Sequence, residues 1–221
     1  MIKKYLINGM ILSLLLCTAA YGQVTPIGDR SKGEFFIGYS NNQVDVGVSD
    51  DNDDFQDFFD DRVSAHGFNV SGVYNFRRYW GVKGDFSAHF KNFDVDDPIT
   101  PSTVYEVDAS LYNFLGGIQV KDNNRDGSRL KPFGHVLVGA AHARTKFNDT
   151  FFEGPFCSDP DFDCDDFTES ETGFAAAFGG GLDVRVTRNF SVRAFQVDYN
   201  PTWIGGSTQH NLRFGAGIVF H

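Results

Sequence analysis

The chain has 221 residues, a formal net charge of −10 and an aromatic content of 15%. This length fits one domain better than two, and the acidic charge excludes nucleic acid as an expected partner. Aromatic residues and 24 glycines favour closely packed strands, so the composition predicts an all-β protein.

The N-terminus has the features of an export signal. Lys3 and Lys4 precede an apolar run at 10–16, and the small residues Ala20 and Gly22 suit a signal peptidase. The alternative is a lipoprotein in which Cys17 is acylated, but the bulky Leu16 before this cysteine disfavours it.

The expected organisation follows from this signal. We predict a cleaved signal peptide at 1–22, a short lead at 23–32 and a single β-barrel domain at 33–221. No stretch after the signal approaches the roughly 18 apolar residues of a membrane-spanning helix. Any crossing of a membrane would therefore use strands.

Eight stretches of the chain alternate between apolar and polar residues, as strands with one apolar face do. The third is the clearest, because Lys83 and Asp85 lie opposite Trp80 and its apolar neighbours. In the seventh, Arg193 differs in parity from Gln196, which predicts a β-bulge. The stretches are 33–40, 66–76, 80–91, 105–121, 131–145, 173–186, 189–199 and 211–221.

The connections between these stretches alternate in length. Short links follow the second, fourth and sixth, and long, acidic or glycine-bearing segments follow the first, third, fifth and seventh. A sheet inserted into a membrane from one side has tight periplasmic turns and long extracellular loops. The sequence therefore predicts an eight-stranded antiparallel up-and-down transmembrane β-barrel.

The two faces of the predicted sheet differ in chemistry. The apolar face is continuous from strand to strand, so we expect it to contact lipid. Eight strands leave an interior just wide enough for side chains, and charges there must pair. We therefore predict a polar, largely filled interior with a charge network formed by Lys83, Asp85, Asp183, Arg185 and Arg213.

The last stretch carries a resemblance to a known family. Arg213, Gly215, Ile218 and Phe220 match the terminal pattern that outer-membrane barrels present to their assembly machinery, and His221 follows the aromatic residue. With the signal and the eight strands, residues 33–221 resemble small OmpA-type or OmpX-like barrels. The resemblance implies a location in the bacterial outer membrane, contact with lipid and lipopolysaccharide, and recognition by the barrel assembly machinery.

Three other features suggest chemistry and have simpler explanations. Cys157 and Cys164 are close together in the acidic segment and are candidates for a local disulfide. The Asp-rich segments 49–61 and 158–167 lack the spacing of a calcium loop. Ser207 and His210 lie near each other in a glycine-rich loop, but no third residue completes a catalytic set. We therefore expect no enzymatic activity, metal or cofactor.

The expected function is that of a structural anchor and surface-interaction protein that acts through acidic extracellular loops, with an extracellular partner. One alternative is a narrow-channel porin for small solutes. The other is a secreted soluble ligand-binding barrel, which would bury the apolar face instead.

Overall fold

The computed structural model describes residues 30–45, 62–96, 103–125, 128–149 and 167–221. Residues 31–221 form one compact unit, which contains every strand of the described chain. The strands are β1 (Gly33–Asp45), β2 (Arg62–Asn75), β3 (Trp80–Asp96), β4 (Thr103–Lys121), β5 (Leu130–Asp149), β6 (Phe167–Arg185), β7 (Phe190–Ile204) and β8 (Ser207–Phe220).

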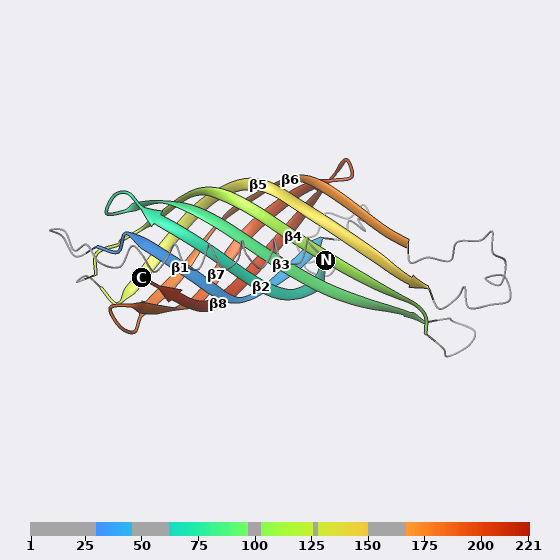
Figure 1. Cartoon of the computed structure of the whole chain (residues 1–221), viewed down its shortest axis with the longest axis horizontal. Coiled ribbons are helices and arrows are strands. Elements are labelled where there is room, and N and C mark those ends of the chain that lie inside the picture. Colours follow the sequence, from blue (N-terminus) through green and yellow to red (C-terminus); the bar gives the residue numbers. More distant parts are fainter. Residues whose placement is uncertain (1–29, 46–61, 97–102, 126–127, 150–166) are drawn as a thin grey trace, which may run out of the picture. The chain divides into compact units, whose positions relative to one another are not determined.

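These eight strands form a closed barrel in which each strand pairs antiparallel with its neighbours in the chain (Figure 1). β1 closes the barrel against β8, with Ile37 opposite Ile218. Closure gives every strand a hydrogen-bonded neighbour on both sides, which a membrane interior requires. The predicted eight-stranded up-and-down fold is confirmed. The described residues contain no helix that is long and apolar enough to cross a membrane.

The connections at one end of the barrel are short. They span residues 76–79, 122–129 and 186–189, as the sequence predicts. The expectation of a long connection after the seventh strand is wrong, because β7 and β8 are joined by Gly205 and Gly206 alone. Both glycines have positive φ, 64° and 75°, which only glycine adopts without strain and which makes a two-residue hairpin turn.

The strands extend further toward the long connections than the sequence alternation indicates. β6 begins at Phe167 and β5 ends at Asp149, so both run well past the predicted ranges. The extra residues of β6 are polar on both faces, as in Thr168 to Thr172. Alternation of apolar and polar residues cannot identify a strand whose two faces are both exposed to solvent, although its backbone pairing continues.

The two faces of the barrel are arranged as the sequence predicts. On β8, the side chains of Phe214 and Ile218 are 40% and 43% exposed, while that of Arg213 is 1% exposed. Phe178 is exposed as well, and Lys83 and Asp183 are buried. These apolar side chains therefore point away from the barrel axis, and these ionic side chains point toward it.

The predicted bulge lies in β7. The pairing of β7 with β8 shifts register between Arg193 and Gln196. Ala194 and Phe195 both lie on the outside, while Arg193, Gln196 and Asp198 are buried inside. The extra residue thus returns the polar side chains of β7 to the interior.

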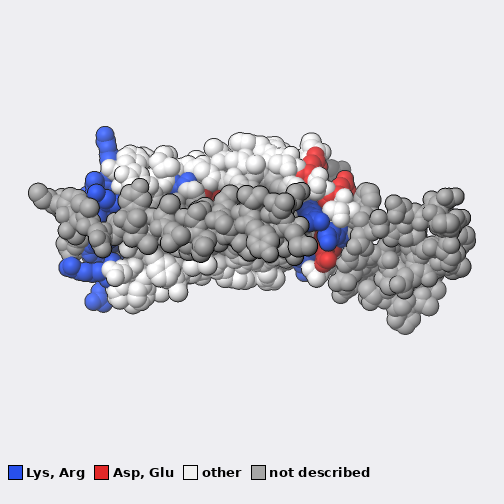
Figure 2. Space-filling model, viewed as in Figure 1, with Lys and Arg blue, Asp and Glu red and all other residues white. Residues whose placement is uncertain are grey.

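Figure 2 shows that the visible middle of the described surface carries very few charged atoms. Lys and Arg gather at one end of the described surface, and both signs of charge occur at the other (Figure 2). The exposed aromatic residues near the short turns include Tyr74, Phe76, Tyr79, Trp80 and Phe220. An apolar band bordered by aromatic side chains is typical of transmembrane barrels.

Candidate functional site

The candidate site is the interior of the barrel, where charged side chains from several strands meet. Arg213 on β8 is at its centre. The Arg213 guanidinium donates to Asp85 Oδ1 at 2.8 Å and to Asp198 Oδ2 at 2.7 Å. Lys83 Nζ lies 3.2 Å from the other oxygen of Asp85. All four side chains are almost fully buried, so their charges interact without screening by bulk water.

A second group of charges lies closer to the short turns. Lys121 Nζ lies 2.6 Å from Glu34 Oε2 and 2.7 Å from Asp183 Oδ2. Arg193 Nε donates to Asp183 Oδ1 at 2.8 Å. Asp183 thus connects a lysine at the end of β4 with an arginine on β7. A buried carboxylate with two cationic partners is the arrangement that a narrow polar interior needs.

Arg193 also contacts two aromatic rings. Its guanidinium carbon lies 4.2 Å from the ring centroid of Phe36 and 4.1 Å from that of Phe133. Two aromatic rings on a cation stabilise it by the attraction of the ring faces for positive charge. Phe36 and Phe133 are thus large aromatic residues that lie buried in the interior, beside this cation.

Glycines make the room for these rings. A Cβ at Gly217 would lie 2.9 Å from Phe36 Cε2, and one at Gly181 would lie 3.0 Å from Phe133 Cζ. These glycines belong to the sequences GGGL and GAG, which occur inside β6 and β8. Their function is to provide space on the inner face, not to bind phosphate.

Two histidines complete the polar part. His135 Nε2 lies 2.9 Å from Asp198 Oδ1, and His89 Nε2 lies 2.8 Å from Ser40 Oγ. Asp198 also accepts a hydrogen bond from Gln196 Nε2 at 2.6 Å. These contacts connect β1 with β3 and β5 with β7 through the interior, and they fill the space around Arg213.

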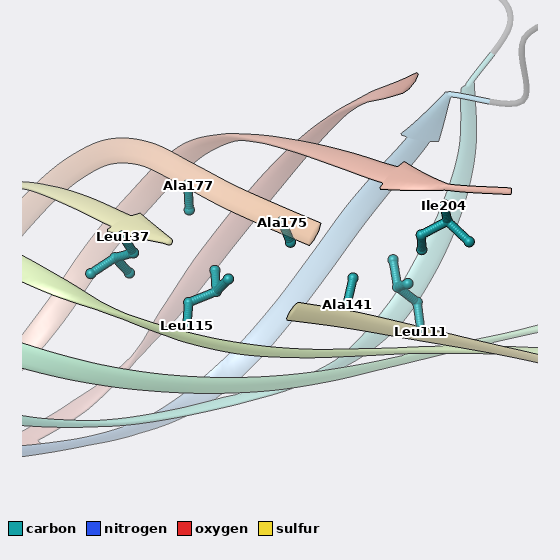
Figure 3. Packing of buried hydrophobic residues seen from close by; sticks show 7 residues of the cluster. All are labelled: Leu111, Leu115, Leu137, Ala141, Ala175, Ala177 and Ile204. Atoms are coloured by element: carbon teal, nitrogen blue, oxygen red, sulfur yellow. The ribbon is translucent and has the colours of Figure 1, made fainter. Parts of the chain in front are cut away.

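An apolar cluster also lies inside the barrel, between β4, β5, β6 and β7. Figure 3 shows its side chains projecting from β4, β5, β6 and β7 into the space between the strands. The cluster consists of Leu111, Leu115, Leu137, Ala141, Ala175, Ala177 and Ile204. The interior is thus not polar throughout, although buried polar side chains such as Asn113 and Asn200 lie on the same strands as this cluster. Apolar side chains inside a barrel resist wetting and so oppose the passage of ions.

The structure brings most of the predicted network together. Lys83, Asp85 and Arg213 form one connected group, and Asp183 belongs to the second group. Arg185 is only half-buried and lies at the turn end of β6, apart from the Arg213 group.

The sequence pattern does not identify Lys121, Arg193 and Asp198 as members of the network. Arg193 and Asp198 have opposite parity in the sequence, and the bulge between them is the signal that both face inward. Lys121 is the last residue of β4, where alternation merges with the turn and no longer indicates a face.

Ser207 and His210 lie in β8, so their predicted position in a loop is wrong. Ser207 Oγ donates to the carbonyl of Ile204 at 3.0 Å, while His210 Nδ1 is hydrogen-bonded to the Tyr199 hydroxyl. Each side chain has its own partner, so the two do not form a nucleophile and base pair.

Two other candidates lie outside the described residues. These are Cys157 with Cys164, and the acidic segments at 49–61 and 158–166. Within the described part of the chain, no group of three or more His, Cys, Asp or Glu side chains could hold a metal ion. Arg213, Gly215, Ile218 and Phe220 all lie on β8, the strand that closes the barrel.

The comparisons with known proteins agree with this geometry. Residues 10–220 match the family model of the outer membrane protein beta-barrel domain. The chain belongs to this family and is a β-barrel protein of the bacterial outer membrane. A search of curated proteins found no match.

Two solved structures are similar in fold. The first is Ail, the attachment invasion locus protein of Yersinia pestis, in complex with the heparin analogue sucrose octasulfate. It has 23% sequence identity and a TM-score of 0.53, and the match covers 86% of this chain and 100% of that one. Neisserial surface protein A has 12% identity and a TM-score of 0.50, with 86% of this chain and 97% of that chain covered.

Proposed function

We propose that the protein is a closed membrane anchor that holds an interaction surface outside the cell and conducts no solutes. The observation that carries this proposal is the filling of the lumen. The Arg213 group and the cluster around Leu115 and Leu137 both occupy the interior of the barrel. A water path would need these buried side chains to move apart.

Four strands are longer than a membrane requires. β3, β4, β5 and β6 have 17, 19, 20 and 19 residues, whereas about 9–11 residues span a bilayer as a tilted strand. On β5 the apolar outer column ends at Ala140, and His142, Arg144 and Lys146 follow on the same face. The residues after His142 add roughly 15 Å beyond the apolar band, at about 3.3 Å per residue and a tilt of about 45°.

These ends form a protruding wall, which we define as residues 91–96, 103–110, 142–149 and 167–173. The ribbons of the four strands extend past the others at one end of the barrel in Figure 1. Among the described residues, β6 before Phe174 pairs with β5 alone, so the wall has an edge there. Glu169 and Glu171 on this edge are exposed, and such charges prevent indiscriminate strand pairing.

The wall and the Asp-rich segments 49–61 and 158–167 favour a partner with positive charge. Ail was solved with a heparin analogue, which is a polyanion. Acidic segments repel a polyanion, so the partner of this chain should differ in sign from that ligand. We propose a basic protein or peptide surface as the partner class, bound without enzymatic turnover.

Two further contacts belong to this proposal. Lipopolysaccharide and other outer-membrane lipids surround the apolar band and its aromatic borders. The barrel assembly machinery recognises β8 by four residues, which are Arg213, Gly215, Ile218 and Phe220. Substitution of Phe220 by a polar residue should lower the amount of protein in outer membranes of cells, while refolding of the purified chain in detergent is little changed.

Cell adhesion and conductance test the proposal together. Cells that express the protein should bind beads coated with a basic peptide more than beads coated with heparin, and neutralising the aspartates at 159–166 should remove the difference. The purified protein should give no steady openings in a planar bilayer. Steady openings would support the narrow-channel porin, and equal binding to both beads would contradict the basic partner.

A further inference from the structure

A polar hollow lies at the mouth of the barrel, at the end with the short turns. It encloses about 280 Å³ with its open side included. Its lining comes from the start of β1, the β4–β5 connection, the β6–β7 turn and His221. The proposed surface function does not use this hollow, and the Arg213 group lies deeper in the barrel.

Positive charge dominates the lining. Two carboxylates, Glu34 and Asp122, face five cationic side chains, which are Lys121, Arg125, Lys131, Arg185 and Arg188. Both carboxylates already have cationic partners, because Lys121 lies 2.6 Å from Glu34 and Arg78 lies 3.3 Å from Asp122. Lys131 Nζ donates to the backbone carbonyls of Asp122 and Asn124, which carry no net charge. The described lining of the hollow therefore holds more cationic than acidic side chains.

Asn123 supplies an independent indication of a ligand. Its side chain is 4% exposed and lines the hollow, and neither its Nδ2 nor its Oδ1 has a hydrogen-bond partner among the described residues. Its backbone is fixed, because Asn123 N donates to the carbonyl of Arg78 at 3.0 Å and its carbonyl accepts from Ser31 N at 3.1 Å. A buried amide without partners costs free energy, and a bound acceptor group would remove that cost.

We propose that this hollow binds a phosphate group, with Asn123 Nδ2 and the side chains of Arg125, Arg188 and Lys131 as donors. Phosphate offers several acceptor oxygens in a tetrahedral arrangement, which matches donors that converge from separate turns. A carboxylate has two oxygens and a single negative charge, so it would satisfy fewer of these donors. The bound group would connect the β4–β5 connection with the β6–β7 turn and so stabilise the turn end of the barrel.

The phosphate could come from free phosphate or from a phospholipid headgroup of the inner leaflet. The experiment therefore has two arms, both followed by the thermal unfolding midpoint of the whole folded chain. In a neutral detergent, inorganic phosphate is titrated against chloride at constant ionic strength. In vesicles, phosphatidic acid is added to a phosphatidylcholine bilayer. A saturable rise with inorganic phosphate assigns the free anion, and a rise with phosphatidic acid alone assigns the headgroup.

Three variants make the test specific. Asn123→Asp places a negative charge of similar size in the hollow, and the double variant Arg125→Gln/Arg188→Gln removes two donors. Each should weaken phosphate binding by about tenfold or more, since hydrogen bonds to a charged group are the strong ones. The matched control, Arg144→Gln/Lys146→Gln, removes the same charge from the far end of the barrel and should bind like the wild type.

A mobility shift on gels without boiling verifies that each variant folds, and ³¹P NMR line broadening measures binding directly if a variant is less stable. The proposal is overturned if phosphate acts no more strongly than chloride and phosphatidic acid has no effect. It is equally overturned if all variants, including the control, respond alike.

Discussion

Replacement of Arg213 by Met tests the buried charge network directly. The substitution keeps most of the side-chain volume and removes the only cation that contacts both Asp85 and Asp198 among the described residues. It also removes a hydrogen bond of 3.0 Å to Ser87 Oγ. Two buried carboxylates then share less positive charge than before.

The expected loss of stability follows from what remains around each carboxylate. Asp85 keeps Lys83 at 3.2 Å and Asn69 at 3.0 Å, and Asp198 keeps His135 at 2.9 Å. Removal of one partner from a buried ion pair costs about 3–5 kcal/mol, because the other charge stays buried. Since both carboxylates retain a partner, we expect about 3–4 kcal/mol for Arg213→Met, and a smaller loss for the double variant with Asp198→Asn.

Urea unfolding of the protein refolded in detergent measures this loss, with the fluorescence of Trp80 and Trp203 as the signal. Arg144→Met is the matched control, because Arg144 is exposed and its loss should cost less than about 1 kcal/mol. Refolding without the assembly machinery separates stability from the predicted role of β8 in assembly. If Arg213→Met unfolds within about 1 kcal/mol of the wild type, the interior is hydrated and the network argument is wrong.

Three other substitutions give distinct outcomes. Leu137→Ala should cost about 2–5 kcal/mol in urea unfolding, because Leu137 is fully buried in the apolar cluster; a smaller loss would mean that the cluster is loose. Gly217→Ala should abolish the heat-dependent gel shift, because its Cβ would overlap the backbone carbonyl of Ile37 and lie 2.9 Å from Phe36, whereas Gly215→Ala, with 3.5 Å to the nearest atom, should keep it. Burial lowers the pKa of His221 from 6.5 to about 4. The unfolded chain therefore takes up this proton first as the pH falls, and stability that is complete above about pH 7 should decline by about 1–2 kcal/mol by about pH 5. His221→Gln should remove that part of the decline, and an unchanged pH profile would refute the burial of a neutral imidazole.

The barrel and its orientation in lipid are predictable from local patterns. The β8 sequence alternates strictly, so the sequence alone assigns Phe214 and Arg213 to opposite faces. The parity change between Arg193 and Gln196 predicts the bulge in β7. Each of these features depends on neighbouring residues in one strand, which is the information that a sequence contains.

The packing of the interior is not predictable in the same way. Whether Phe36 lies beside Arg193 depends on the register of strands that are far apart in the sequence. The leucines at 115 and 137 alternate with apolar outer residues, so no change of polarity marks them as inward-facing. The length of the β7–β8 connection is overestimated because the polar residues beyond the bilayer resemble a loop although they pair as strands.

The central claim is that apolar side chains of the barrel face lipid while the ionic ones face its axis. The most direct test places a single tryptophan at position 214, by Phe214→Trp in a background with Trp80→Phe and Trp203→Phe, and reconstitutes the protein in bilayers. The account predicts strong quenching by lipids brominated on their acyl chains and little quenching by acrylamide in the water. Quenching by acrylamide with none from the brominated lipids would contradict it.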